Sequence, residues 1–432
     1  MTRDTRRRTA RDSAVTAEPA QAAAQPEPVP SAPWAGRAAF ALAILCGVLL
    51  AALAFGPHSV ADQYAETDFI GGYAAGARAI QAGRLDAARF GVTGPVYELT
   101  LAAAATLVRN MEVAGKLLSL LAACGTLLLW FRLVERRAGA VAALWTSAFL
   151  LTNPIFVRYG SSLTTDMLAS LTQAAALYAL FGRHGRRALP WAGVLTAVAI
   201  LTRYNAVYLL PAALWSGAGR DARAPRGAGG AGSAVMSLLS FVAGFAAVAA
   251  PWLVFSIAQG HVPGEALIHD FAFGAFAQGQ GISWDEYASR LQPGFRSLGD
   301  VLNHDPAALR GRLLGNLVSH ARLDVERVLW LPAAIACAVG ALFSLAGGTW
   351  RRMLPLWAAG LLLYLSLVPV FHSERYSLAL VPFYLSFAGI AVAAPVRALR
   401  PRGWPPAPQW ALALAALALS AWVCAGYQRQ VL

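Results

Sequence analysis

Long apolar segments, separated by short polar connections, run through most of the chain. The first of them, residues 38–55, contains no charged side chain, and segments of similar character recur as far as residue 425. A transmembrane helix needs about 20 predominantly apolar residues, and by that criterion the pattern predicts about eleven spans. They are expected at residues 38–55, 113–133, 138–156, 167–181, 191–202, 206–215, 234–258, 328–346, 354–371, 377–394 and 410–425.

The polar connections divide the chain into a tail, one membrane domain and two large outer loops. Residues 1–36 are rich in Ala, Pro, Glu and Arg without apolar periodicity, which predicts a disordered cytoplasmic tail. A membrane domain is expected at residues 37–427, with outer loops at 56–112 and 259–326. Residues 428–432 would form a short outer tail. Because lipid cannot satisfy open backbone groups, the sequence predicts an all-α, polytopic bundle of transmembrane helices.

Three stretches inside the outer loops have a helical pattern but are poor candidates for spans. Residues 73–82 are amphipathic, and residues 99–108 are only mildly apolar and have charged neighbours on both sides. We interpret them as short helices at the membrane surface. Residues 306–329, at the end of the second loop, also have a helical pattern.

Composition and charge support a membrane protein and set its orientation. Hydrophobic residues make up 57% of the chain and charged residues 13%, about half the fraction of roughly 25% that is usual in soluble domains. The net charge is +13, and basic clusters such as Arg136-Arg137 and Arg351-Arg352 fall in connections assigned to the cytoplasmic side. The positive-inside rule accounts for them without a nucleic-acid partner. It places the amino terminus in the cytoplasm and the carboxyl terminus outside the cytoplasmic (inner) membrane.

The cysteines and histidines do not form a recognisable metal or redox motif. All four cysteines lie within apolar segments and none has a Cys-x-x-Cys partner, which is typical of small buried hydrophobic residues. His372 is interpreted as a polar loop residue, because no His/Asp spacing resembles a ligand set. We therefore predict neither a metal site nor a cofactor.

The polar residues with unusual positions share one side of the predicted membrane domain. Asp68, Asp166, Arg203 and the turn 372–376 all lie at outer ends of spans. A carboxylate there can deprotonate a hydroxyl nucleophile, and guanidinium groups can hold a lipid phosphate through charge-assisted hydrogen bonds. A base and a phosphate clamp are what sugar transfer from a lipid-phosphate donor requires.

Each of these residues also has a simpler interpretation. Asp68 and Asp166 both precede predicted helices, so either carboxylate could serve only as an N-cap. Arg203 could be an interfacial anchor whose guanidinium reaches the polar lipid region. Arg375 could pair with the adjacent Glu374, which would contribute little to stability if the pair is exposed.

Several short motifs follow one another in a fixed order over about residues 38–396. They are Asp68 with Gly-Gly-Tyr-Ala-Ala-Gly-Ala-Arg-Ala at 71–79, Gly94-Pro95-Val-Tyr97, Thr152-Asn153-Pro154, Leu163-Thr-Thr-Asp166, Leu201-Thr-Arg203-Tyr-Asn205, and Glu374-Arg375-Tyr376 before Pro382-Phe383. Each motif is weak alone, but the ordered set resembles the GT-C superfamily of polyprenyl-phosphate-sugar-dependent glycosyltransferases. The nearest groups are the protein mannosyltransferases and the lipid A aminoarabinose transferases.

The resemblance implies roles for the residues at the outer boundary. Asp68 would correspond to the base that activates the acceptor, and Asp166 to a second carboxylate that binds acceptor or orders the first loop. Arg375 and Tyr376 would form the turn that binds the donor phosphate, with Arg203 beside them. The family's second loop often carries more than one acidic residue, whereas Asp166 stands alone here. The family's large carboxyl-terminal domain also has no counterpart in this sequence, so the acceptor stays open.

The leading hypothesis is therefore an integral membrane glycosyltransferase with its active site on the periplasmic or extracellular side. It would take a polyprenyl-phosphate-sugar donor and an envelope glycolipid, glycan or protein acceptor, with membrane lipids around it. A transporter or lipid flippase is the alternative, but such proteins place ionisable residues near the membrane midplane and often contain repeated halves. Here the ionisable residues lie at span ends and no internal repeat is visible. A non-catalytic subunit of an envelope complex is a third possibility.

Overall fold

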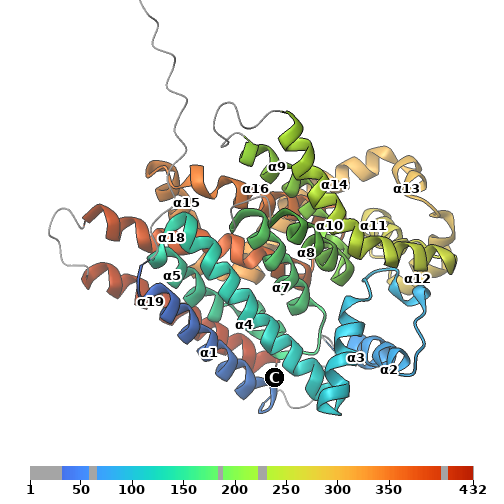
Figure 1. Ribbon diagram of the computed structural model, residues 1–432, viewed down its shortest axis with the longest axis horizontal. Coiled ribbons are helices and arrows are strands. Elements are labelled where there is room, and N and C mark those ends of the chain that lie inside the picture. The colour runs from blue at the N-terminus through green and yellow to red at the C-terminus, as the bar shows by residue number, and fades with distance from the viewer. Residues whose placement is uncertain (1–31, 58–65, 183–187, 222–230, 400–406, 432) are drawn as a thin grey trace, which may run out of the picture.

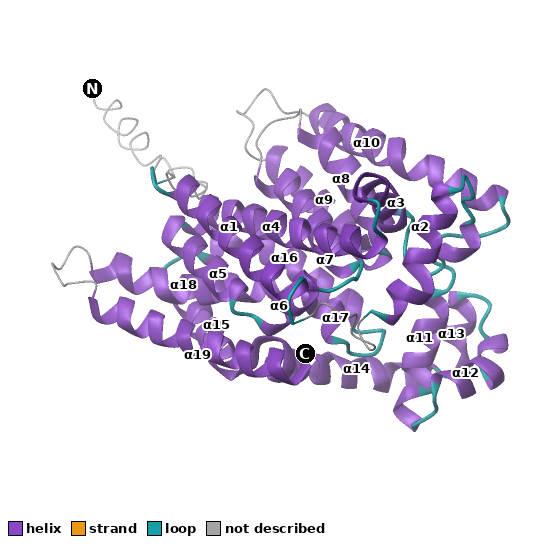
Figure 2. Cartoon of the chain, turned by 90° about the horizontal axis from the view of Figure 1, so that it is seen from below, coloured by secondary structure: helices purple, strands orange, loops and turns teal. Residues whose placement is uncertain are grey.

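The structure, a computed structural model, describes residues 32–57, 66–182, 188–221, 231–399 and 407–431. These residues form helices joined by turns, and no strand occurs among them (Figure 2). The predicted all-α fold is therefore confirmed. Most of the predicted tail 1–36 lies outside the described residues, and helix α1 already begins at Ala35. At the other end α19 continues to Val431, through most of the predicted outer tail 428–432.

Every predicted span corresponds to a helix, in the same order along the chain. Among the described residues, five helical segments are long and apolar enough to cross a membrane, and the α5–α6 pair, bent by 66°, would add a sixth. The protein is thus a multi-pass membrane protein, and the count of eleven crossings stays a prediction. The helices are α1 (Ala35–Ala54), α4 (Met111–Ala138), α5 (Ala140–Leu151), α6 (Pro154–Ser161), α7 (Asp166–Leu177), α8 (Ala188–Thr202), α9 (Leu209–Asp221), α10 (Ala231–Ala258), α15 (Trp330–Ala346), α16 (Trp350–Leu367), α18 (Val381–Leu399) and α19 (Ala407–Val431).

The outer loops contain short helices that gather at one end of the molecule (Figures 1 and 2). The stretches 73–82 and 99–108 are helical as expected, although their position relative to a membrane is not tested. The helical tract 306–329 is also present, and it continues through a π-helical turn directly into α15. The elements are η1 (Phe69–Tyr73), α2 (Ala74–Gln81), α3 (Val96–Val108), α11 (Leu267–Phe276), α12 (Trp284–Arg290), α13 (Leu298–His304), α14 (Pro306–Leu323), η7 (Asp324–Leu329) and α17 (Glu374–Ser377).

Helix α4 forms the centre around which the amino-terminal half packs. It contacts α1, α3, α5 and α7 (Figure 1), and its aromatic residues Trp130 and Phe131 are buried. Elsewhere small residues allow close contact between helices. A Cβ atom on Gly193 of α8 would lie 2.1 Å from the carbonyl oxygen of Phe241 in α10. Close packing at small residues is the usual way in which helices associate in membranes, where the hydrophobic effect does not drive them together.

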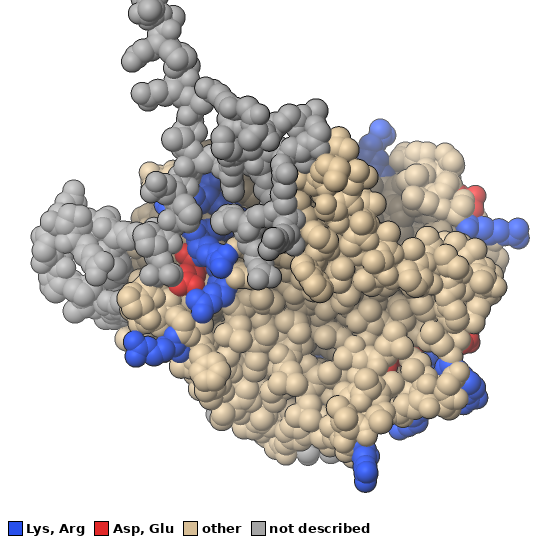
Figure 3. Space-filling view, viewed as in Figure 1, with Lys and Arg blue, Asp and Glu red and all other residues tan. Residues whose placement is uncertain are grey.

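The outward side of the bundle is apolar. On α1 the side chains of Phe40, Ile44 and Val48 recur every four residues and are 65%, 53% and 62% exposed. Figure 3 shows a broad face without charged residues, with Lys, Arg, Asp and Glu towards its margins. An apolar stripe of this kind fits contact with lipid tails rather than water.

The predicted orientation can be tested at the last helix. Because α19 (Ala407–Val431) is long enough to cross a membrane, topology reporters fused after Arg402 and after Arg429 should report opposite sides, with the first one cytoplasmic. Reporters on the same side of the membrane would contradict the predicted span count.

Candidate active site

Asp68 lies at the start of the π-helix η1, where its side chain is 49% exposed. As an N-cap it should accept a hydrogen bond from a backbone N–H of the helix, but its side chain makes none. Its Oδ2 instead accepts a hydrogen bond from Nη1 of Arg375 at 2.5 Å. A methyl group added at Gly71 or Gly72 would meet no atom within 4 Å. The helix beside Asp68 therefore borders open space, and capping does not account for this carboxylate.

Asp166 is the first residue of α7, and its side chain is only 2% exposed. Its Oδ2 accepts a hydrogen bond from Nε of Arg375 at 2.5 Å, and its Oδ1 accepts one from Nη1 of Arg203. Both oxygens of this buried carboxylate thus contact guanidinium groups, as buried charges require. N-capping does not account for Asp166 either, because the N-cap position of α7 is Thr165.

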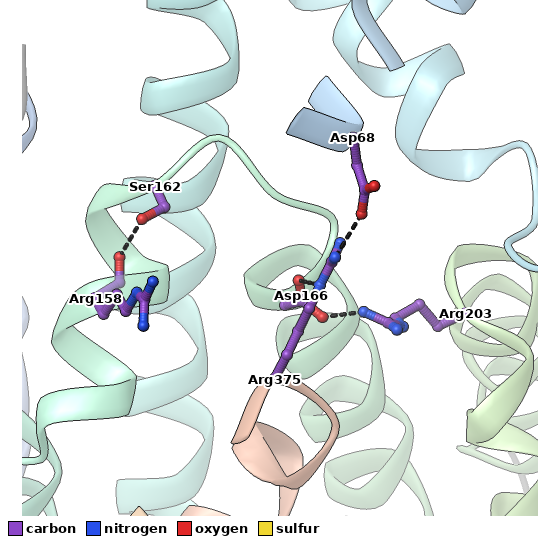
Figure 4. Close-up of polar contacts among 6 residues, drawn as sticks. All are labelled: Asp68, Arg158, Ser162, Asp166, Arg203 and Arg375. Carbon is purple, nitrogen blue, oxygen red and sulfur yellow. Dashed lines mark hydrogen bonds and ion pairs between the residues drawn. The ribbon is translucent and has the colours of Figure 1, made fainter. Parts of the chain in front are cut away.

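The two arginines come from opposite sides of Asp166 (Figure 4). Arg203 follows the carboxyl end of α8, and its guanidinium lies 5.1 Å from the centroid of the Tyr376 ring. Arg375 projects from the short helix α17 and bridges Asp166 and Asp68 (Figure 4). It does so instead of pairing with its neighbour Glu374, which accepts a hydrogen bond from the hydroxyl of Tyr427 at 3.2 Å.

All five residues singled out from the sequence therefore meet at one place. Residues 68, 166, 203 and 375 are joined by ion pairs, and Tyr376 covers one guanidinium. Two carboxylates and two guanidinium groups leave the cluster without net charge. The two aspartates nevertheless differ, because Asp166 is buried between both arginines while Asp68 has one of them and reaches solvent. Only Asp68 is free to approach a second molecule.

Three further residues at this place were not predicted from the sequence. Glu66 is fully buried, and its Oε1 accepts a hydrogen bond from the backbone N–H of Leu163 at 2.5 Å, which connects the loops before Asp68 and Asp166. Burial raises the pKa of the Tyr73 hydroxyl, and the nearby Arg375 opposes that rise. Tyr73 belongs to the motif that follows Asp68, but nothing in the sequence indicates that it lies near Arg375.

Asp270 of α11 is the third. Burial raises its pKa to about 6, and the positive charge of Arg203 partly opposes the rise. Helix α11 belongs to the second outer loop. Local sequence does not predict how that loop packs against the first outer loop. The only signal was an acidic residue inside a largely apolar stretch.

The raised pKa of Asp270 has a consequence for stability. A carboxyl group whose folded pKa is above its unfolded value binds protons more tightly when folded, so stability falls as pH rises from about 4 to about 6. The penalty at neutral pH is of the order of 3 kcal/mol. Asp270→Asn should therefore be more stable than the wild type at pH 7.5, and the difference should disappear near pH 4.

Thermal unfolding in detergent as a function of pH measures this, with Asp300→Asn as the control. The pKa of Asp300 is lowered by hydrogen bonds from the backbone of Arg296 and Ser297, so that variant should lose stability at pH 7.5. A stability difference for Asp270→Asn that does not vary with pH would contradict the raised pKa of Asp270.

No group of three or more His, Cys, Asp or Glu side chains in the described part of the chain is arranged to hold a metal ion. The side chains at this place are carboxylates, guanidinium groups and phenols, which supply a proton acceptor, anion binding and hydrogen bonds.

Comparison with solved structures gives the architecture a name. ArnT from Cupriavidus metallidurans, bound to undecaprenyl phosphate, superimposes with a TM-score of 0.53 at 16% identity over 89% of this chain. The archaeal oligosaccharyltransferase AglB from Archaeoglobus fulgidus, in complex with an inhibitory peptide and a dolichol-phosphate, superimposes with a TM-score of 0.55 at 13% identity over 93%. The chain has the GT-C fold. It spans 63% of the length of that ArnT and 56% of that AglB.

A comparison of the sequence with family models agrees with the GT-C fold over a shorter region. The family model for dolichyl-phosphate-mannose-protein mannosyltransferase matches residues 92–223, which include Asp166 and Arg203 but neither Asp68 nor Arg375. A comparison with curated proteins found no match. The resemblance to the GT-C superfamily predicted from the ordered motifs is thus supported by the family model and by the fold.

Proposed function

We propose that this protein is an integral membrane glycosyltransferase that moves a sugar from a polyprenyl-phosphate-linked donor to an envelope acceptor. The observation that carries the proposal is the unequal pair of aspartates, in which Asp166 is buried between two guanidinium groups and Asp68 is half exposed beside one of them. Such an arrangement puts a proton acceptor next to two anion-binding groups.

The donor phosphate would bind where the arginines lie. The described contacts use Nε and Nη1 of Arg375 and Nη1 of Arg203, and each guanidinium has five N–H donors. Asp166 holds both groups in place and is too enclosed to contact an acceptor. We therefore assign Asp166 to ordering the arginines, and Arg375, Arg203 and the adjacent Tyr376 to the donor phosphate. The lipid phosphates in the ArnT and AglB complexes support this choice of donor class.

The reaction would be a single displacement. The carboxylate of Asp68 takes the proton of the acceptor hydroxyl as its oxygen attacks the anomeric carbon of the sugar. The bond from that carbon to the phosphate oxygen breaks at the same time, and the electron pair leaves with the polyprenyl phosphate. Arg375 and Arg203 stabilise the charge that grows on the phosphate. Because attack comes from the face opposite the leaving group, the anomeric configuration is inverted.

The site would lie on the periplasmic or extracellular side of the cytoplasmic membrane, at the end of the bundle where α2, α3 and α11–α13 gather (Figure 2).

Mass spectrometry of envelope glycolipids, glycans and glycoproteins from cells with and without the gene tests the function. One sugar should be missing from one class of acceptor in cells without the gene. An unchanged envelope, with a polyprenyl-linked lipid retained on one side of the membrane, would instead favour a flippase.

A further inference from the structure

The segment that carries Arg375 is held by side chains from the end of the second outer loop. Asn316 of α14 donates its Nδ2–H to the carbonyl oxygens of Val368 and Val370, at 2.9 and 3.5 Å. Further along, Nε2 of His372 lies 3.0 Å from Oδ1 of Asp324. Residues 368–372, which lead into α17, are therefore fixed from one side before the chain reaches Arg375.

Asp324 is the most constrained member of this set. Its side chain is 3% exposed, and that of His372 is 8% exposed. Oδ2 of Asp324 accepts a hydrogen bond from the hydroxyl of Tyr384 in α18 at 2.8 Å, so both carboxylate oxygens have partners. The ring of His320 packs edge-on against that of His372, with 5.3 Å between centroids. A buried carboxylate with this many fixed partners defines one geometry, and losing a partner is costly.

The backbone around Asp324 is unusual as well. Asp324 begins the π-helix η7, a type of turn that occurs frequently at functional sites. The residue that follows η7, Trp330, has a φ of 65°, which is rare for a residue other than glycine. The Nδ2 group of Asn153 donates to the carbonyl oxygen of Val328 at 2.7 Å. This hydrogen bond fixes the end of η7, the turn that Asp324 begins.

No hydrogen bond or ion pair joins Asp324 to Arg375, but only a short turn separates Arg375 from His372. The carbonyl oxygen of Ser373 accepts hydrogen bonds from the backbone N–H groups of Tyr376 and Ser377, at 3.0 and 3.1 Å. Such a turn leaves little freedom between the imidazole and the guanidinium. We propose that Asp324 is a positioning residue that orients Arg375 through its hydrogen bond to His372. The proposal deepens the function proposed above and rests on it.

The variant Asp324→Asn tests this. Oδ2 of Asp324 accepts from Tyr384 and Oδ1 pairs with His372, whereas asparagine offers one acceptor oxygen and one amide donor. One of the two partners would therefore have to reverse its hydrogen-bonding role to keep its contact. We expect kcat/KM for sugar transfer to fall about 10-fold, because a misplaced side chain loses charge-assisted contacts to the leaving phosphate. Glu326→Gln is the matched control, since Glu326 lies two residues away with its side chain 47% exposed and paired with Arg322.

A double-mutant cycle shows whether Asp324 acts through Arg375. If it does, the variant Asp324→Asn/Arg375→Ala should be no less active than Arg375→Ala alone. Losses that multiply would overturn the proposal. If Asp324→Asn does not fold, the pair His372→Gln and His372→Phe replaces it. Glutamine keeps an N–H donor and should retain most activity, whereas phenylalanine has no donor and should lose about 10-fold, like Asp324→Asn.

Hydrogen exchange separates this proposal from the proposed function. The backbone amides of residues 368–377 should exchange faster in Asp324→Asn than in the wild type and in Glu326→Gln. Unchanged exchange in this segment would overturn the positioning role even if the protein transfers sugar. Faster exchange in Asp324→Asn, together with a wild-type chain that transfers no sugar, would uphold the contact and reject the function.

Discussion

Asp68→Asn should reach the membrane in normal amounts but transfer sugar about 10²–10⁴-fold more slowly than the wild-type chain, the usual contribution of a general base. Asparagine has the shape of aspartate and caps helices about as well, but it cannot take the proton of the acceptor hydroxyl. Because Asp68 makes no capping hydrogen bond and is half exposed, the substitution should hardly change the free energy of unfolding.

Turnover, expression and thermal stability must be measured together for Asp68→Asn. Asp285→Asn is the control, since Asp285 is an exposed aspartate in the first turn of α12, in the second outer loop. That variant should match the wild type in all three measurements. Full turnover in Asp68→Asn would rule out Asp68 as the base.

Arg375→Ala should reduce kcat/KM about 10- to 100-fold, because a charge-assisted hydrogen bond contributes roughly 1.5–3 kcal/mol. Asp166 keeps Arg203 as a partner in this variant, so we expect folded protein with a damaged phosphate site. The kcat/KM of Arg375→Lys should lie between those of Arg375→Ala and the wild type. Lysine restores the positive charge but lacks the planar guanidinium that contacts two carboxylates at once.

Arg290→Ala provides the comparison for Arg375→Ala. Arg290 also pairs with a carboxylate on the outer side, that of Glu286, but its side chain is 74% exposed. An exposed pair of this kind contributes little, so transfer should be unaffected. Equal and negligible effects of the two substitutions would remove Arg375 from the site.

Local sequence was enough to predict the helices, and the predicted topology together with the resemblance to the GT-C superfamily singled out the residues that meet at the site. Long apolar segments are sufficient to predict helices. When successive predicted spans alternate in direction across a membrane, residues 68, 166, 203 and 372–376 fall on one side of it. The partners within the cluster were not predictable, because nothing near Arg375 in the sequence indicates that it bridges two aspartates rather than pairing with Glu374. The simpler interpretations of Asp68 and Asp166 as caps fail for the same reason, since their partners lie far away along the chain.

The residues that support the site could not be predicted from the sequence for a different reason. Glu66, Asp270 and Asp324 act through burial against distant elements, and burial depends on how the two outer loops pack. The π-helical turn at Asp324 is a further case, because the pattern of residues 306–329 indicates a helix but not the extra residue in its last turn. His372, interpreted from the sequence as an ordinary polar loop residue, is buried and paired with Asp324.

The most direct test of the account is sugar transfer by the purified chain in lipid. A membrane extract that contains radiolabelled polyprenyl-phosphate sugars supplies the donor, and an envelope extract supplies the acceptor. The account predicts that the wild-type chain releases free polyprenyl phosphate and forms a product of inverted anomeric configuration, and that Asp68→Asn does neither at a measurable rate. Retention of configuration, or no release of polyprenyl phosphate by the folded wild-type chain, would contradict it.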